Sequence, residues 1–522
     1  MTEAAAPPGQ QPDPKAWIAV AGAIFGTFMA LLDVSVTNAS LPQIQGEIGA
    51  TGTEGTWIGT GYLVAEIVMI PLTAWFSRLM GERNFLVAAS ILFTLFSMLC
   101  GLSGNLTAMI AGRVGQGFFG GALIPASLTI IATRLTDKQR PMGLMIYAAV
   151  AVLAPVIGPV VGGWLTENLS WHWLFFMNLP IAIVLIPLLF MGIGAATPDL
   201  GELRRADWLG IAGLAMFLGS LTVILEEGQR ENWFDSDMIT RLTFVSALGF
   251  LFVMYSQFTH PHPVVKLRLL LNSSYRAVFG IVMMIGAGSF TMLYVVPVFL
   301  GTISGYNAQQ TGAVAMWTGL ATFMMMPLLM VMMQKVDIRI IVGAGMAIFG
   351  SSCLMTLDLT PDSVGHDFIW QQFINGIGQP MVGLTLSQAA TAGLKDDEIP
   401  DGTALFSMAR NLGGSMGLAL TGILIDRRTA FHIDQIGQAT TANSAVAQER
   451  IAQIAHGMLR DGADPAYATA RALKMIGAEV QRQALVMSYI DGFWLMGFGI
   501  ILAIPAVLLL KRPKPGAAAM AH

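Results

Sequence analysis

The sequence predicts an all-α polytopic membrane protein, and three observations support that fold class. Of its 522 residues, 54% are hydrophobic and only 11% are charged, and the mean hydropathy is +0.65. A soluble domain cannot bury so much apolar surface, so the bilayer must act as solvent for most of the chain. About fourteen segments are long and apolar enough to cross roughly 30 Å of hydrocarbon. Lys and Arg also concentrate in alternate loops between these segments.

The predicted helices follow one another along the whole chain. The first begins near Trp17, shortly after Lys15, as the apolar part of a signal peptide would. Its length, the carboxylate of Asp33 near its end and the many later spans identify it instead as the first transmembrane helix. The spans are centred near Thr27, Glu66, Thr94, Phe118, Val152, Ile183, Met216, Phe250, Gly288, Thr322, Ile348, Gly378, Gly413 and Gly499.

The basic residues orient these spans, because Lys and Arg are enriched in short cytoplasmic loops. The intervening short loops near Glu47, Asn105, Glu167, Asn307 and Asp362 contain neither residue. The loop at 226–241 is mixed but acid-rich, and a long loop such as 427–487 crosses regardless of its charge. Both termini are therefore predicted to be cytoplasmic. The basic loops contain Arg78, Arg83, Arg134, Lys138, Arg140, Arg204, Arg205, Lys266, Arg268, Arg276, Lys335, Arg339 and Lys395, and the tail contains Lys511, Arg512 and Lys514.

The two halves of the chain resemble each other weakly. Residues 74–86 and 330–342 both place a basic turn after the second helix of a half, and 113–125 has a looser counterpart at 373–386. Internal repeats of this kind are typical of transporters. We predict cytoplasmic tails at 1–15 and 511–522, a six-helix bundle at 16–196, an inserted helix pair at 205–260, a second bundle at 274–426 and 488–510, and a periplasmic loop at 427–487.

The predicted loop at 427–487 contains two amphipathic stretches. Residues 445–462 and 466–487 repeat apolar side chains every three or four positions. This pattern favours one or two helices that lie on the membrane or against a partner. A solvated linker is an equal alternative.

Three charged residues fall inside spans of the first half, where burial of charge is costly and indicates function. From the helix rise, Asp33 lies about 24 Å from the cytoplasmic side, and Glu66 and Arg113 lie about 15 and 10 Å below the outer side. We expect Arg113 to compensate Asp33, which would face a wet cavity. Asp33 and Glu66 would then bind protons or cationic substrate alternately, with Arg113 setting their affinity. The alternative is a buried ion network that only fixes helix packing.

The second half carries one charge of this kind, Arg410, about 12 Å from the cytoplasmic side. No intramembrane carboxylate partner for it is evident, so it either binds an anionic substrate group or extends to the interface and packs there. The thirteenth span also contains Asn411. Six methionines on the tenth span suit either a cavity for varied cargo or filling between helices. The cavity candidates are Asn38, Gln116, Asn375, Gln379 and Met325.

Five stretches, in this order, carry a family resemblance: "LDVSVTNASLP" (32–42), "EGTWIGTGYLVAEIVMIPLTAW" (54–75), "RVGQGFFGGALIP" (113–125), "APVIGPVVGGW" (154–164) and "WHWLFFMNLPI" (171–181). Together they resemble the major facilitator superfamily, and within it the fourteen-helix drug:proton antiporters of the EmrB type. The resemblance covers nearly the whole chain.

The resemblance implies two six-helix bundles plus two central helices, and proton-coupled export of hydrophobic or amphiphilic compounds by alternating access. It implies a proton gradient as the energy source, no cofactor, and a place in the bacterial inner membrane. It also implies a periplasmic adaptor of the EmrA type and an outer-membrane channel of the TolC type, with the 427–487 loop as one candidate contact. In such antiporters, the motif formed here by Pro155, Gly158, Pro159, Gly162 and Gly163 is associated with the bundle interface; a lipid-facing kink is the alternative.

One motif departs from the wider superfamily. Arg78 stands where an aspartate is usual in the loop after the second helix, and Ala74 replaces the opening glycine, whereas Gly81 and Arg83 are kept. EmrB-like members also tend to be basic at this place. The change puts in doubt an inward-side gating salt bridge that relies on the aspartate.

Other functions have less support. An exporter of an endogenous metabolite, such as a siderophore, would keep the fold, and so would a sensor without turnover. A membrane-embedded acyltransferase needs a buried His or an Asp–His pair, and the seven histidines fall outside the span centres. No P-loop or metal-ligand spacing occurs, so an ion gradient is the expected energy source. The net charge of −4 gives no indication of nucleic-acid binding, and Cys100 and Cys353 lie in apolar runs, which disfavours a disulfide framework.

Overall fold

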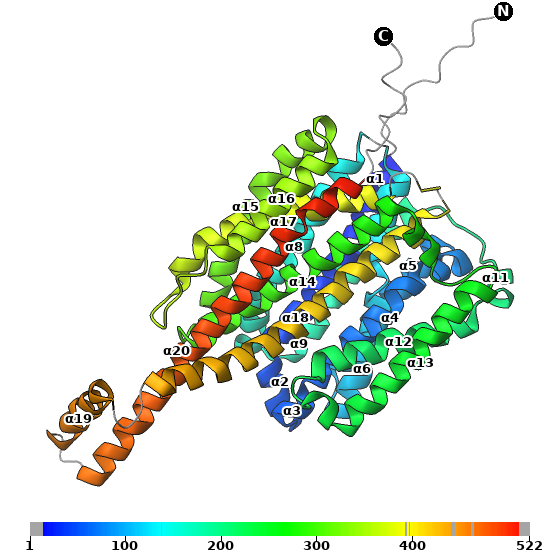
Figure 1. The fold of residues 1–522 in the computed structure, drawn as a ribbon. Coiled ribbons are helices and arrows are strands. Elements are labelled where there is room, and N and C mark those ends of the chain that lie inside the picture. Colours follow the sequence, from blue (N-terminus) through cyan, green and yellow to red (C-terminus); the bar gives the residue numbers. More distant parts are fainter. Residues whose placement is uncertain are drawn as a thin grey trace, which may run out of the picture.

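The computed structural model describes residues 14–136, 138–391, 394–395, 397–439, 444–460 and 464–510, and that part of the chain is helical without strands (Figure 1). The predicted all-α polytopic fold is confirmed. The predicted tail at 511–522 lies outside the described residues, as do residues 1–13 of the other tail and residues 440–443 and 461–463 of the predicted loop.

Within the described residues, eleven helices are long and apolar enough to cross a membrane. The fourteen predicted span centres nevertheless all fall in helices. The three remaining helices are α16 (Ile338–Leu354), which has only 17 residues, and α17 (Ile369–Thr391) and α18 (Ile399–Ala439), which do not reach the same apolarity.

The helices form two halves with a pair between them. The first half contains α1 (Pro14–Ala39), α2 (Leu41–Ile48), α3 (Gly52–Gly55), α4 (Trp57–Met80), α5 (Glu82–Gly101), α6 (Leu106–Gly120), α7 (Leu123–Arg134), α8 (Arg140–Asn168), α9 (His172–Phe176) and α10 (Asn178–Gly192). The middle contains α11 (Gly201–Arg204), α12 (Trp208–Glu227), η1 (Trp233–Asp235), α13 (Asp237–Thr259) and η2 (Leu267–Leu271). The second half contains α14 (Ser273–Thr302), α15 (Ala308–Lys335), α16, η3 (Gly365–Phe368), α17, α18, α19 (Ala445–Arg460), α20 (Pro465–Leu502) and η4 (Ile504–Leu509).

Polar residues begin several of these helices. Asn105 accepts a hydrogen bond from the Ala108 amide at the start of α6, and Asp207 accepts one from Gly210 at the start of α12. Asn307 and Gln310 form a capping box at the start of α15. Such side chains satisfy amides that the helix itself leaves unpaired. They stop the apolar segments at defined residues and so set the loop positions.

Glycine allows the helices to approach closely. A Cβ on Gly117 of α6 would collide with the Tyr62 carbonyl of α4, and one on Gly286 of α14 would collide with the Arg410 carbonyl of α18. Because lipid tails are as apolar as Leu, close packing of this kind replaces the hydrophobic effect as the force between spans.

The two ends of the bundle differ. Helix α1 begins and α20 ends at the same end of the bundle (Figure 1). We call this the basic end, because Arg78, Arg134, Lys266 and Arg339 lie there. At the opposite end, α18 and α20 continue beyond the other helices and carry α19 at their tip (Figure 1). We call this projection, the described residues of 427–487, the stalk.

The structure of the stalk distinguishes between the two interpretations of residues 427–487, amphipathic helices and a solvated linker. Residues 445–460 form α19, and Ala455 of α19 packs in one apolar cluster with Ala468 and Ala472 of α20. The predicted helical periodicity is confirmed, but the apolar face of α19 lies on α20 of the same chain; placement on the membrane or against a partner stays a prediction. The linker alternative is wrong for the described part of the loop, because α18 and α20 continue through most of it.

Several helix–helix contacts join the halves. Helix α8 lies along α15, α4 and α7 lie along α18, and α12 packs on α4 with a smaller contact on α18. Any motion of one half against the other must therefore change these contacts.

Candidate functional site

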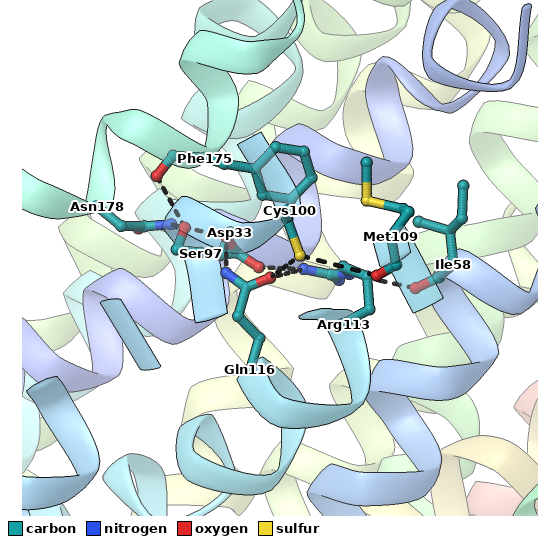
Figure 2. Close-up of polar contacts among 9 residues, drawn as sticks. All are labelled: Asp33, Ile58, Ser97, Cys100, Met109, Arg113, Gln116, Phe175 and Asn178. Atoms are coloured by element: carbon teal, nitrogen blue, oxygen red, sulfur yellow. Dashed lines mark hydrogen bonds and ion pairs between the residues drawn. The ribbon is translucent and has the colours of Figure 1, made fainter. Parts of the chain in front are cut away.

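The first part of the candidate site is a closed polar network around Asp33 (Figure 2). The Asp33 carboxylate on α1 accepts hydrogen bonds from Arg113 at 2.5 Å, Gln116 at 2.8 Å and Asn178 at 2.7 Å. Asn178 also donates to the Ser97 hydroxyl at 2.9 Å. Asp33 is 1% exposed, so three donors from α6 and α10 replace its hydration shell.

Arg113 is held just as firmly. It is 1% exposed, donates from Nε to the Ile58 carbonyl at 3.2 Å and from Nη1 to Gln116 Oε1 at 2.9 Å. Its guanidinium lies 4.3 Å from the centroid of the Tyr62 ring on α4. A buried ion pair costs desolvation energy, which is offset only when its other hydrogen-bonding positions are also satisfied, as most are here.

These contacts confirm the prediction that Arg113 compensates the charge of Asp33. The prediction that Asp33 faces a wet cavity is wrong in this conformation. The carboxylate is enclosed by donors, as in the packing alternative. Gln116, predicted as a cavity residue, belongs to the network instead. Asn178 and Ser97 were not predicted, although Asn178 lies in one of the five family-like stretches.

Glu66 has a different environment, although it is also buried, at 7% exposure. Among the described residues, none makes a hydrogen bond or salt bridge with its carboxylate. It lies within electrostatic range of Arg113 from its own half and of Arg410 from the other. Tyr147 of α8 is a further neighbour of Arg410. The side chain of Arg410 therefore faces two residues of the first half.

Among the described residues, Arg410 forms no salt bridge with a carboxylate, but the Glu66 carboxylate on α4 of the first half lies within its electrostatic range. The sequence did not indicate this neighbour. Asn375 is buried at 4% exposure on α17, and Gln379 is half-buried on the same helix.

The loop motif takes part in an ion cluster at the basic end. Arg78 Nη1 lies 3.2 Å from both oxygens of Asp401 on α18, and Lys266 Nζ lies 2.8 Å from Asp401 Oδ2. Asp401 is 3% exposed. We call Arg78, Lys266 and Asp401 the basic-end latch. A salt bridge between the halves thus exists at this place, with Arg78 as its cation where the wider superfamily usually has an aspartate.

The other two motif residues shape the turn. Gly81 has φ +77°, in the left-handed region that favours glycine, and a Cβ there would also collide with Ala196. Arg83 lies over the Phe190 ring at 5.3 Å. Beside the latch, the hydroxyls of Thr129 on α7 and Thr403 on α18 are hydrogen-bonded at 2.6 Å.

The proline–glycine motif packs α8 against α1. Pro159 has no N–H, which leaves the Pro155 carbonyl without its helical donor, and the Ser35 hydroxyl donates to that carbonyl at 3.0 Å. A Cβ on Gly158 would collide with Ser35, and one on Gly162 would meet the Val36 carbonyl at 3.1 Å. A Cβ on Gly163 would meet nothing within 4 Å. The motif therefore joins α8 to its own half, while another face of α8 lies along α15.

An apolar crevice of about 300 Å³ lies between α8 and α15. Of the predicted cavity residues, none lines it: Asn38 is exposed at the end of α1, and Met325 is buried in the core at 9% exposure. The tenth-span methionines point in different directions, because Met324 is 61% exposed. Nothing in the sequence distinguishes the residues that line the crevice, which are mostly apolar: Ala149, Val152, Leu153, Val156, Met316, Gly319, Leu320, Thr322 and Phe323.

Comparison with known proteins identifies the family. Residues 23–427 match the family model described as Major Facilitator Superfamily. The chain belongs to this superfamily. The protein is thus a multi-pass membrane protein of a transporter family.

Similar proteins in this superfamily include named exporters and resistance proteins. The chain is 33% identical over 501 residues to the colistin resistance protein EmrB of Acinetobacter baumannii, covering 96% of each. It is 28% identical over 499 residues to the multidrug export protein EmrB of Escherichia coli K12, covering 94% of each. The crystal structure of the human organic anion transporter MFSD10 matches with a TM-score of 0.59 at 12% identity, over 94% of this chain and 100% of that one, which supports the major facilitator fold.

One buried histidine lies outside this superfamily core, at the base of the stalk. His432 is 5% exposed, and its Nε2 lies 2.8 Å from Asp491 Oδ2. The absence of an Asp–His pair inferred from the sequence is therefore wrong. Arg428 Nε lies 2.6 Å from the same oxygen. The Asp491 carboxylate is therefore shared between His432 and the guanidinium of Arg428, which is always charged. The pair joins α18 to α20.

Proposed function

We propose that this protein exports hydrophobic or amphiphilic compounds in exchange for protons, by alternating access between its two halves. Family membership supports transport, and the similarity to EmrB proteins over nearly the full length of both chains supports drugs and toxic compounds as cargo. The proton gradient supplies the energy, without a cofactor.

The environment of Glu66 is the observation that carries this proposal. Its carboxylate is buried between the halves, lacks a direct hydrogen bond to any described residue, and has one guanidinium from each half nearby. When α18 moves relative to α4, the distance from Glu66 to Arg410 changes while the distance to Arg113 does not. Proton binding at Glu66 and the position of the halves are then linked, because nearby charge and desolvation determine protonation.

The Asp33 network has a separate role in this scheme. Its three hydrogen bonds, which include the ion pair with Arg113, hold Arg113 in place on α6 and so keep one positive charge near Glu66 at all times. Asp33 acts as a positioning residue, and Glu66 exchanges protons. The crevice between α8 and α15 offers an apolar surface for cargo that arrives from the bilayer.

The topology that we propose places the basic end in the cytoplasm of a bacterial inner membrane, in accordance with the distribution of Lys and Arg. The stalk would then lie in the periplasm. Helix α18 has 41 residues and is about 60 Å long, twice the hydrocarbon thickness. A stalk of that reach suits contact with an EmrA-like adaptor, which would connect the pump to a TolC-like channel.

The test is proton-driven uptake of a lipophilic cationic dye into proteoliposomes. We expect Glu66→Gln to reduce uptake to the level of empty liposomes, because a permanently neutral side chain cannot exchange protons. The control is Asp237→Asn, which neutralises a carboxylate that is 95% exposed and should leave uptake unchanged. Undiminished uptake by Glu66→Gln would refute the proposed coupling.

A further inference from the structure

Residues 226–230, "EEGQR", lie at the stalk end of α12, in the helix pair inserted between the halves. The sequence placed them in an acid-rich loop. In the structure Glu226 and Glu227 form the last turn of α12, and Glu227 is 4% exposed. All four polar side chains of this segment have partners, and these partners alternate between the two halves.

Two of the side chains bind the second half. Glu226 Oε1 accepts a hydrogen bond from the Ser415 hydroxyl at 3.1 Å, and Gln229 donates to Asp426. Ser415 and Asp426 are both on α18, three turns apart and on the same face. The two contacts are therefore spaced by about 16 Å along one helix, which resists both tilting and sliding of α18.

The other two side chains bind the first half. Glu227 Oε1 accepts from the Thr60 hydroxyl at 2.7 Å, and Arg230 donates to the Thr56 hydroxyl. Arg230 also forms a salt bridge of 2.8 Å with Glu227. Thr56 lies at the start of α4 and Thr60 one turn further along it, and Gly219 of α12 approaches Val64 and Val68 further along the same helix. This side of α12 is thus attached to α4 over several turns.

We propose that residues 226–230 form a clasp that closes the stalk end of the transporter. Glu227 and Arg230 anchor the clasp to α4, and Glu226 and Gln229 hold α18. This inference rests on the proposed alternating access, in which the stalk end opens when α18 moves away from α4. Opening breaks the contacts of Glu226 and Gln229 with α18, whereas those of Glu227 and Arg230 with α4 persist. The inserted pair thereby supplies a gate at the end opposite the basic-end latch.

The inference is tested first by distances, independently of transport. Spin labels at Gln229→Cys with Asp426→Cys report on the contact with α18, and labels at Thr56→Cys with Arg230→Cys report on the contact with α4. Cys100 and Cys353 are fully buried and can remain. In proteoliposomes we expect two distance populations for the first pair and one for the second. A single population at 229 and 426, or two at 56 and 230, would overturn the clasp.

The same cysteine pairs then test the consequence for transport. A short reducible thiol cross-linker between residues 229 and 426 should reduce dye uptake about tenfold or more, and reduction of the linker should restore it. The same linker between residues 56 and 230 replaces one anchoring contact on α4 by a covalent one, so uptake should fall much less than with 229 linked to 426. Continued uptake with 229 linked to 426 would refute the clasp. Two distance populations at 229 and 426 in a protein without any proton-driven uptake would instead refute the proposed function and leave the clasp standing.

Discussion

At the scale of single residues, two carboxylates of the same bundle have opposite environments. Asp33 accepts three hydrogen bonds, of which the one from Arg113 is also an ion pair. Glu66 makes no hydrogen bond to a described residue and has only two guanidinium groups within electrostatic range. Both carboxylates are buried, so depth in the membrane does not distinguish them. The number of neighbouring hydrogen-bond donors decides which carboxylate is fixed in place. The same logic applies to Asp401, whose single charge is shared by Arg78 and Lys266.

We expect Asp33→Asn to destabilise the protein strongly, because it leaves the Arg113 guanidinium buried without a counter-charge. Breaking one side of a buried pair costs about 3–5 kcal/mol. The double variant Asp33→Asn with Arg113→Met removes both charges and should recover a large part of that loss. Thermal unfolding in detergent, followed by size-exclusion chromatography, measures both. Equal losses in the single and double variants would mean that the charge pair is not what the single change disrupts.

At the scale of elements, the packing of α8 on α1 depends on small residues and on one hydroxyl. Two prolines interrupt the hydrogen bonds of α8, and Ser35 of α1 satisfies one of the freed carbonyls. Gly158 and Gly162 leave room for α1, and Gly163 points away. On other faces of the same segment, Val160 lies opposite Gly312 of α15, and the exposed Trp164 suits contact with lipid.

Gly158→Ala should therefore cost about 1–3 kcal/mol, because the new methyl group displaces Ser35 and its hydrogen bond to the Pro155 carbonyl. Gly163→Ala is the matched control on the same helix. It meets nothing within 4 Å and should be neutral or stabilising by up to about 1 kcal/mol, since alanine favours the helix. Melting temperatures in detergent compare the two. If Gly163→Ala is as harmful as Gly158→Ala, the close approach to α1 is not the cause.

At the scale of the whole molecule, polar contacts hold the halves together at both ends. The basic-end latch joins α4, α18 and the chain after α13, and the 226–230 segment joins α4 to α18 at the stalk end. A transporter that opens one end at a time must break one set while keeping the other. Both sets of contacts are present in this structure.

Asp401→Asn should loosen the basic end, because Arg78 and Lys266 then lose the carboxylate that neutralises them and repel each other. Spin labels at Thr133→Cys on α7 and at Lys395→Cys, four residues before the start of α18, would report a longer and broader distance. Glu82→Gln is the control, since it breaks only the exposed pair of Glu82 with Arg134 inside the first half. An unchanged distance in Asp401→Asn would show that the latch does not hold this end closed.

The sequence by itself determined the fold class, the position of every span and the pairing of Asp33 with Arg113. The length of the apolar segments, the basic residues in the loops and the charged residues inside spans are properties of local segments. They are the same in any arrangement of the helices. The ion pair of Asp33 with Arg113 could be predicted because both residues lie at similar depth in the same half of the chain. The amphipathic helix of the stalk was also visible, as a period of three to four residues.

Only the tertiary structure decided which partners come from the other half. Glu66 lies within electrostatic range of Arg410, 344 positions away in the sequence, and Asp401 of α18 pairs with Arg78 of α4. The polar residues at 226–230 contact both α4 and α18. His432 and Asp491 likewise meet because α18 and α20 run together through the stalk. Hydropathy gives the depth of a residue but not the direction of its side chain around the helix, and contacts between halves depend on both.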